Sequence, residues 1–206
     1  MATRFLWVAL AVSIVVIVTI AIGSLSRESD LSEASSGSYT PQTEERLYSM
    51  PPSLVVIGDS YTGGSDMGGR GEDNWMPIMA KRLGYLPCSY AIGGSGWSKG
   101  RAGLTFGARI DWALSRDPDV LVFFNGVSDL QSDTAEVGRI VDAALFDLRA
   151  QNPNIPVVVI SPVLVRDSAA PKTRVLADEI EVAAKRHNAV FVDPMAEAGS
   201  VVPTAN

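Results

Sequence analysis

The chain contains almost no cysteine or histidine. Its 206 residues include one cysteine, Cys88, and one histidine, His187. One cysteine cannot form an intrachain disulfide, and one histidine cannot supply the paired ligands of common zinc sites. The sequence therefore excludes a disulfide scaffold, and we expect neither a metal nor an organic cofactor.

Positive charge is also scarce. There are 17 Lys and Arg residues against 23 Asp and Glu residues, which gives a formal net charge of -6. Nucleic-acid binding depends on basic residues that neutralise phosphates. A nucleic-acid partner is therefore not expected. Hydrophobic residues make up 47% of the chain, enough to build a packed core.

The longest apolar run without charge is residues 5–23. As a helix it would rise about 28 Å, close to the roughly 30 Å of a bilayer core. Secretory signals have shorter apolar regions and a small-residue cleavage site, which Ala21-Ile22-Gly23 resembles only weakly. We predict a transmembrane anchor at 5–23 behind a cytoplasmic segment 1–4. Arg4 favours an outward-facing domain, which would be secreted if the apolar segment were cleaved.

Residues 24–52 are rich in Ser and Glu and predict a disordered linker. In the domain that follows, 53–206, short apolar runs alternate with amphipathic stretches. Strands are expected at 54–57, 86–92, 119–124, 156–160 and 189–192, and helices at 74–83, near 104–114, at 135–150 and at 172–186. This alternation predicts an α/β fold: a parallel sheet of about five strands in three α/β/α layers. Because 193–206 does not resemble a closing helix, we expect either an early end to the fold or a C-terminally incomplete domain.

Small residues follow three of the predicted strands. They are Gly58-Asp59-Ser60, the loop 92–97 and the loop 125–129. The carboxyl ends of parallel strands meet at one sheet edge, where α/β proteins bind ligands. Exposed backbone N–H groups there can stabilise an oxyanion, and Ser60 is a candidate nucleophile. The alternative is that Asp59 and Ser60 only satisfy backbone groups in a turn.

Gly58-Asp59-Ser60, the glycine loop 93–96 and Gly126-x-Ser128-Asp129 together resemble the SGNH, or GDSL-type, hydrolases. The resemblance covers about residues 53–195. It implies a flavodoxin-like sheet and hydrolysis of lipid or acylated-glycan esters through an acyl-enzyme on Ser60.

The resemblance also assigns the oxyanion hole. The N–H groups of Ser60 and Gly94 would contribute to it, with Gly93 and Gly96 as alternative alignments of the second glycine. Asp59 and Asp129 would support the loops.

The chain departs from the family pattern in its third motif. The family has Gly-x-Asn-Asp, and its Asn side chain completes the oxyanion hole. Ser128 stands at that place, and its hydroxyl is shorter and rotates freely. Asn125, three residues earlier, is the alternative donor.

The second departure concerns the general base. The family's histidine belongs to an Asp-x-x-His motif, but the residue three places after Asp193 is Ala196. His187 precedes the last strand, so it should lie at the amino edge of the sheet, roughly 17 Å from the carboxyl edge. Hydrogen-bond reach is about 3 Å. We therefore expect His187 to be a helix-end residue and the chain to be a weak or inactive esterase.

Two alternatives remain open. The chain could be a catalytically dead, membrane-tethered module that binds an acylated glycan or a protein. It could also be a flavodoxin-like FMN-binding domain, because residues 60–65 resemble a phosphate loop, although Asp59 would repel a phosphate. Of the tryptophans, Trp75 and Trp112 are expected in the core, whereas Trp97 could belong to the core or line the cleft.

Overall fold

The computed structural model describes residues 50–65, 69–124, 126–163 and 170–198. The predicted anchor at 5–23 and nearly all of the linker at 24–52 lie outside the described residues. Among the helices that are described, none is long and apolar enough to cross a bilayer. The membrane anchor therefore stays a prediction.

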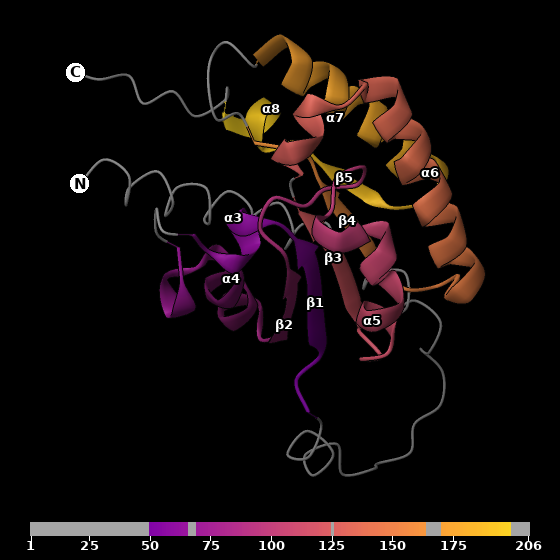
Figure 1. Cartoon of the computed structure of the whole chain (residues 1–206). Coiled ribbons are helices and arrows are strands. Elements are labelled where there is room, and N and C mark those ends of the chain that lie inside the picture. The colour runs from indigo at the N-terminus through magenta and orange to yellow at the C-terminus, as the bar shows by residue number, and fades with distance from the viewer. Residues whose placement is uncertain (1–49, 66–68, 125, 164–169, 199–206) are drawn as a thin grey trace, which may run out of the picture.

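Five strands form one parallel sheet in the order β2-β1-β3-β4-β5 (Figure 1). They are β1 (Ser53–Gly58), β2 (Leu86–Ala91), β3 (Val120–Phe124), β4 (Val157–Ile160) and β5 (Val190–Val192). Every neighbouring pair is parallel. The predicted α/β class and five-stranded parallel sheet are confirmed.

The helices alternate with these strands along the chain. They are α3 (Ser60–Gly63), α4 (Trp75–Leu83), α5 (Ile110–Leu114), α6 (Thr134–Gln151), α7 (Ala170–Arg186) and α8 (Pro194–Ala198). Within the described ranges, four 3-10 segments accompany them: η1 (Gly71–Asp73), η2 (Arg101–Gly103), η3 (Gly107–Arg109) and η4 (Val127–Gln131). The side chains of Asn74 and Asp133 cap α4 and α6, and Gly84 ends α4 in the left-handed conformation.

Successive residues of β1 point to opposite faces of the sheet. Val55 and Ile57 belong to the core beneath α5, α6 and α7, whereas Leu54 and Val56 belong to the core beneath α4. All four side chains are fully buried. Each contributes about 1.5–3 kcal/mol through burial, which explains why the strand is a continuous apolar run rather than an alternating one.

The register of the sheet brings three loops to one edge. Gly58, the last residue of β1, pairs with Ala91 at the end of β2 and with Phe124 at the end of β3. The segments that follow these three strands therefore begin side by side. They are the three segments that the sequence marks with small and polar residues.

Candidate active site

Ser60 is the first residue of the single-turn helix α3, two residues past the end of β1. The preceding Asp59 caps this helix, because its carboxylate accepts a hydrogen bond of 2.8 Å from the Tyr61 N–H. The same carboxylate accepts a bond of 3.3 Å from the N–H of Gly126, after β3. Asp59 therefore provides an acceptor for an N–H group of the turn and also links the turn to the third loop.

Gly58 allows this tight turn. A β-carbon at position 58 would overlap the side chain of Thr62, which folds back over the strand end. A larger residue would push α3 away from β1. The glycine of the Gly58-Asp59-Ser60 motif is thus required by close packing within the turn.

The glycine loop after β2 lies directly against Ser60. A β-carbon at Gly93 would lie 3.7 Å from the Ser60 Cβ. Gly94 is the next residue, is exposed, and has a positive φ of 74°. Gly96 donates its N–H to the Lys99 carbonyl at 2.7 Å, so that donor is already engaged. Gly93 is therefore the glycine with a close approach to Ser60, and Gly96 is the one whose N–H is not available as a donor.

Ser60 and the glycine loop after β2 present backbone N–H groups that have no partner in the described part of the chain. No hydrogen bond there engages the backbone N–H of Ser60, Gly93 or Gly94. Unengaged donors beside a hydroxyl are what an oxyanion hole needs. The assignment of Gly94 remains a prediction, because only Gly93 shows a close approach to Ser60, and a β-carbon at Gly94 would meet nothing within 4 Å.

Asp129 joins the second and third loops. Its carboxylate is fully buried and accepts hydrogen bonds from the Trp97 N–H at 2.7 Å and the Ser98 N–H at 2.9 Å. The Ser98 hydroxyl adds a third bond at 2.6 Å. Asp129 therefore links the two loops through these three bonds, and its supporting role in the site stays a prediction.

Ser128 lies next to Asp129 in η4 and is partly exposed at this edge. The alternative donor, Asn125, lies outside the described residues. The oxyanion role of Ser128 stays a prediction.

Residues at the start of α4 also hydrogen-bond to the turn that carries Ser60. The Asn74 amide donates to the carbonyl of Thr62 at 2.9 Å, and the Trp75 indole donates to the carbonyl of Tyr61 at 3.0 Å. The Trp75 ring meets Phe124 edge to face, with centroids 4.7 Å apart. The first turn of α4 thus supports α3 through its backbone.

On the opposite face, the fully buried Arg109 reaches the strand ends. Its guanidinium donates to the carbonyl of Gly58 at 2.9 Å, to the carbonyl of Tyr90, and to the Ser95 hydroxyl at 2.8 Å. Burial lowers the pKa of Arg109 to about 10, an effect opposed by the charge of Asp59, so the group stays charged at neutral pH. Sequence reasoning missed this residue, because it lies inside a predicted amphipathic helix with no motif around it.

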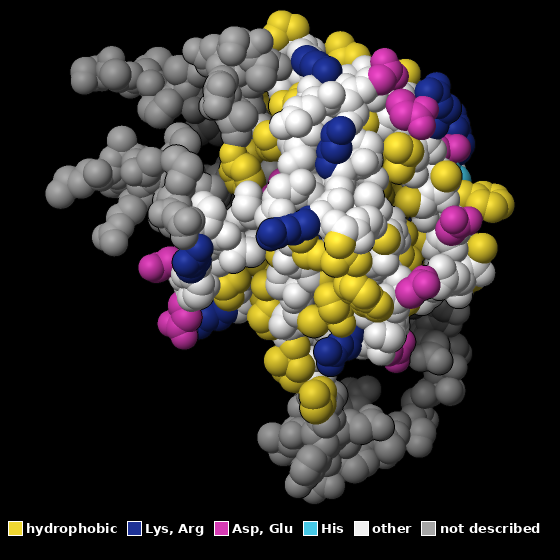
Figure 2. Space-filling model, in the orientation of Figure 1, with side chains coloured by type: hydrophobic (Ala, Val, Ile, Leu, Met, Phe, Trp, Pro, Cys, Tyr) yellow, Lys and Arg dark blue, Asp and Glu magenta, His cyan; other side chains and the backbone are white. Residues whose placement is uncertain are grey.

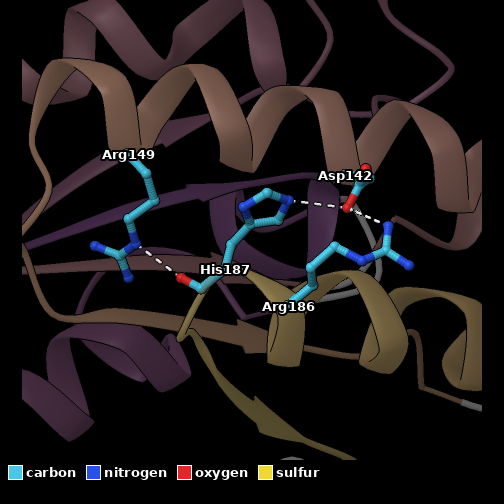
Figure 3. A network of polar contacts seen from close by, with 4 residues as sticks. All are labelled: Asp142, Arg149, Arg186 and His187. Carbon is cyan, nitrogen blue, oxygen red and sulfur yellow. Dashed lines mark hydrogen bonds and ion pairs between the residues drawn. The ribbon is translucent and has the colours of Figure 1, made fainter.

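His187 lies at the opposite edge of the sheet from Ser60. It follows α7 and precedes β5, whose first residue pairs with Val158 inside β4. Its Nε2 lies 2.9 Å from the Asp142 carboxylate, which also binds Arg186 (Figure 3). The structure therefore keeps His187 away from Ser60, as expected from the sequence.

The tryptophans divide differently from the prediction. Trp75 is buried as expected, and Trp97 is buried against Phe106 and Phe123, so it belongs to the core. The prediction for Trp112 is wrong, because 46% of this residue is exposed. Helix α5 turns Ile110 and Ala113 inward, which leaves Trp112 on the outer side.

Exposed hydrophobic side chains are scattered among charged ones over the face drawn in Figure 2.

Comparisons with known proteins agree with this geometry. The model of the GDSL-like lipase/acylhydrolase family matches residues 56–204. The GDSL lipase Rv0518 of Mycobacterium tuberculosis is 31% identical over 170 residues, which cover 78% of this chain and 72% of that protein.

Solved structures share the fold at lower identity. AlinE4, described as an SGNH-hydrolase family esterase, superposes with a TM-score of 0.53 at 19% identity, covering 74% of this chain and 81% of its own. A family two carbohydrate esterase from Clostridium thermocellum gives a TM-score of 0.55 at 16% identity, covering 70% of this chain and 54% of its own. With a family match over most of its described residues and a curated relative of the same kind, the chain belongs to the GDSL-like lipase/acylhydrolase family.

Proposed function

We propose that this chain is a serine ester hydrolase that acts through Ser60. The observation that carries the proposal is Ser60 in the turn at the carboxyl edge, where Gly93 lies close to the Ser60 Cβ and the N–H groups of Ser60, Gly93 and Gly94 have no partner in the described part of the chain. The Ser60 oxygen attacks the acyl carbonyl, the alcohol leaves with a proton, and water then releases the acid. The N–H groups of Ser60 and Gly94 and the Ser128 hydroxyl face the developing oxyanion.

The expected activity is low. Serine is a weak nucleophile without an adjacent base, and the only histidine in the sequence is held by Asp142 at the far edge. An oxyanion hole and binding alone leave about 10³- to 10⁴-fold catalysis over water. We therefore expect slow turnover by the 206-residue chain.

The substrate class follows from the relatives rather than from a pocket. One relative is named a lipase and one structural neighbour a carbohydrate esterase. Two hollows in the described surface, one between α5 and α6 and one between α7 and β5, do not include Ser60 in their lining. An acyl ester of a lipid or a glycan is the proposed substrate.

The test measures hydrolysis of p-nitrophenyl acetate and labelling by a fluorophosphonate probe, with and without millimolar imidazole as an external base. We expect slow labelling of Ser60, accelerated by imidazole and absent in Ser60→Ala. Ser115→Ala is the matched control, because Ser115 is exposed and its hydroxyl only caps the Trp112 carbonyl. Equal rates in wild type and Ser60→Ala would reject the nucleophile assignment.

A second candidate is a binding module without catalysis, which the remote position of His187 favours. In that case no labelling would occur even with imidazole, while acylated glycans would still bind near Ser60.

The strand order 2-1-3-4-5 is that of flavodoxin-like sheets and supports the expected classification of the fold as flavodoxin-like. The buried Asp59 carboxylate beside residues 60–65 disfavours the FMN-binding alternative.

We further propose that residues 5–23 anchor an outward-facing domain. The length of the uncharged run and the preceding Arg4 support this. Sedimentation with membranes after alkaline carbonate washing, and release into the soluble fraction on deletion of 5–23, are the expected results. Carbonate-extractable full-length protein would contradict the anchor.

A further inference from the structure

Burying the charged side chain of Arg109 is energetically unfavourable for the folded protein. Its side chain is fully buried, and among the described residues no carboxylate lies within ion-pair distance of it. A buried charge without a paired counter-charge is unfavourable unless its donors are satisfied. The acceptors that satisfy these donors therefore indicate which parts of the fold the side chain holds together.

The guanidinium satisfies its donors on separate segments of the chain. Nε donates to the Thr105 carbonyl at 3.0 Å, and one terminal nitrogen donates to Gly58 and Tyr90 carbonyls at the ends of β1 and β2. The other terminal nitrogen donates to the Ser95 hydroxyl at 2.8 Å. These contacts use four of the five N–H groups that an arginine carries.

The segments joined in this way carry the reacting groups. Gly58 is two residues before Ser60, and Ser95 follows Gly93 and Gly94 in the loop packed against Ser60. The Ser95 hydroxyl also bonds to the Ile92 carbonyl at 2.7 Å, which closes the turn containing both glycines. A planar guanidinium therefore fixes the distance between the nucleophile turn and the glycine loop.

Resting on the proposed function, we propose that Arg109 is the positioning residue that holds the Ser60 hydroxyl and the Gly93–Gly94 N–H groups in one constellation. A displacement of about 1 Å in such a constellation can lower reactivity by about 100-fold. Lysine keeps the charge but concentrates its donors on one nitrogen, so it cannot span the same acceptors. Methionine of similar length removes both charge and donors.

Arg149 is a matched control. Its guanidinium also donates to backbone carbonyls, those of His187 at 2.8 Å, Ile155 at 2.6 Å and Asn188 at 3.1 Å, but it does so at the opposite edge of the sheet (Figure 3). Replacing either arginine removes the same kind of contact. Only Arg109 lies beneath the nucleophile turn.

The experiment compares Arg109→Lys, Arg109→Met and Arg149→Lys in the full chain. The rate of fluorophosphonate labelling at Ser60 is corrected for the folded fraction from thermal unfolding. We expect Arg109→Lys to label at least about tenfold more slowly and Arg109→Met about 100-fold more slowly, with Arg149→Lys within about twofold of wild type. Wild-type labelling per folded molecule in Arg109→Met would overturn the proposal.

A second measurement does not depend on activity. Amide hydrogen exchange at Thr62, Ile92 and Ser95, whose N–H groups bond to the carbonyls of Asp59, Gly58 and Ile92, should accelerate by at least about tenfold in Arg109→Lys relative to Arg149→Lys, because the local opening free energy falls. Unchanged exchange would overturn the positioning role even if wild type labels. If wild type fails to label while exchange accelerates as expected, the proposed hydrolase function fails and the positioning role stands. Should both Arg109 variants fail to fold, Ser95→Ala removes one acceptor and should show a smaller change in both measurements.

Discussion

A β-carbon at Gly96 would overlap the buried carboxylate of Asp129, so the two residues fit together only because position 96 carries no side chain. Gly126 approaches the same carboxylate, where a β-carbon would lie 2.8 Å from Oδ2, and its φ of 93° is one that glycine adopts readily. Glycines from two loops therefore surround one carboxylate. The loops that face Ser60 are positioned by this packing.

Gly96→Ala should destabilise the protein by about 1–3 kcal/mol, because the added methyl group must displace Asp129 or the loop. Urea unfolding measures the loss. Gly93→Ala is the stability control, since its new Cβ would make only ordinary contact with Ser60. Equal stabilities of the two variants would contradict the packing described here.

Asp129→Ala should lower the free energy of unfolding by about 3 kcal/mol, because it leaves the Trp97 N–H and both Ser98 donors without their acceptor. Asp129→Asn keeps one acceptor oxygen and should lose less. Asp111→Ala, an exposed carboxylate on α5, should change stability by less than about 0.5 kcal/mol. A native-like unfolding free energy for Asp129→Ala would show that the loops are not held by this carboxylate.

Asn74→Ala should reduce both stability and Ser60 reactivity. Asn74 caps α4 and also donates to the backbone of α3, so we expect a loss of about 2 kcal/mol and slower fluorophosphonate labelling of the folded protein. Asp133→Ala removes the cap of α6, away from the site, and should cost about 1 kcal/mol with labelling unchanged. If both variants label at the wild-type rate, the support from α4 does not reach Ser60.

The contribution of Asp142 to stability should depend on pH. Burial acts to raise the pKa of this carboxyl, but hydrogen bonds with His187 and Arg186 outweigh it and leave the pKa below its ordinary 3.8. The carboxylate form is thus favoured by folding, so its contribution is present above the ordinary pKa and is lost as pH falls through the lowered one.

Asp142→Asn is expected to cost less than about 1 kcal/mol at pH 7, because Asp142 and Arg186 are partly exposed. Denaturant unfolding at pH 7 and below pH 3 should show the difference shrinking with acid. Asp147→Asn on the same helix is the matched control, because no ion pair of Asp147 is found among the described residues. A difference that grows on acidification would reverse the assigned sign.

Local sequence patterns were enough to predict the sheet and the sheet edge that carries Ser60. Apolar runs such as Val120–Phe124 and helical stretches such as Thr134–Gln151 are recognisable because their patterns are local. Once the strands are parallel, each strand's carboxyl end lies at the same edge, which placed Ser60 beside the glycine loop and His187 away from it. Helices α3 and α8 were not predicted, because one turn of helix leaves no periodic pattern.

Which atoms meet at that edge depends on how the elements pack in three dimensions. The contact of Gly93 with Ser60, the burial of Asp129 under Gly96 and the reach of Arg109 to three chain segments depend on distances between loops far apart in sequence. Trp112 lies outside the core because α5 is a five-residue helix whose inward side is already filled by Ile110 and Ala113. Local patterns fix which element forms, whereas packing between elements fixes which side chain each position can hold.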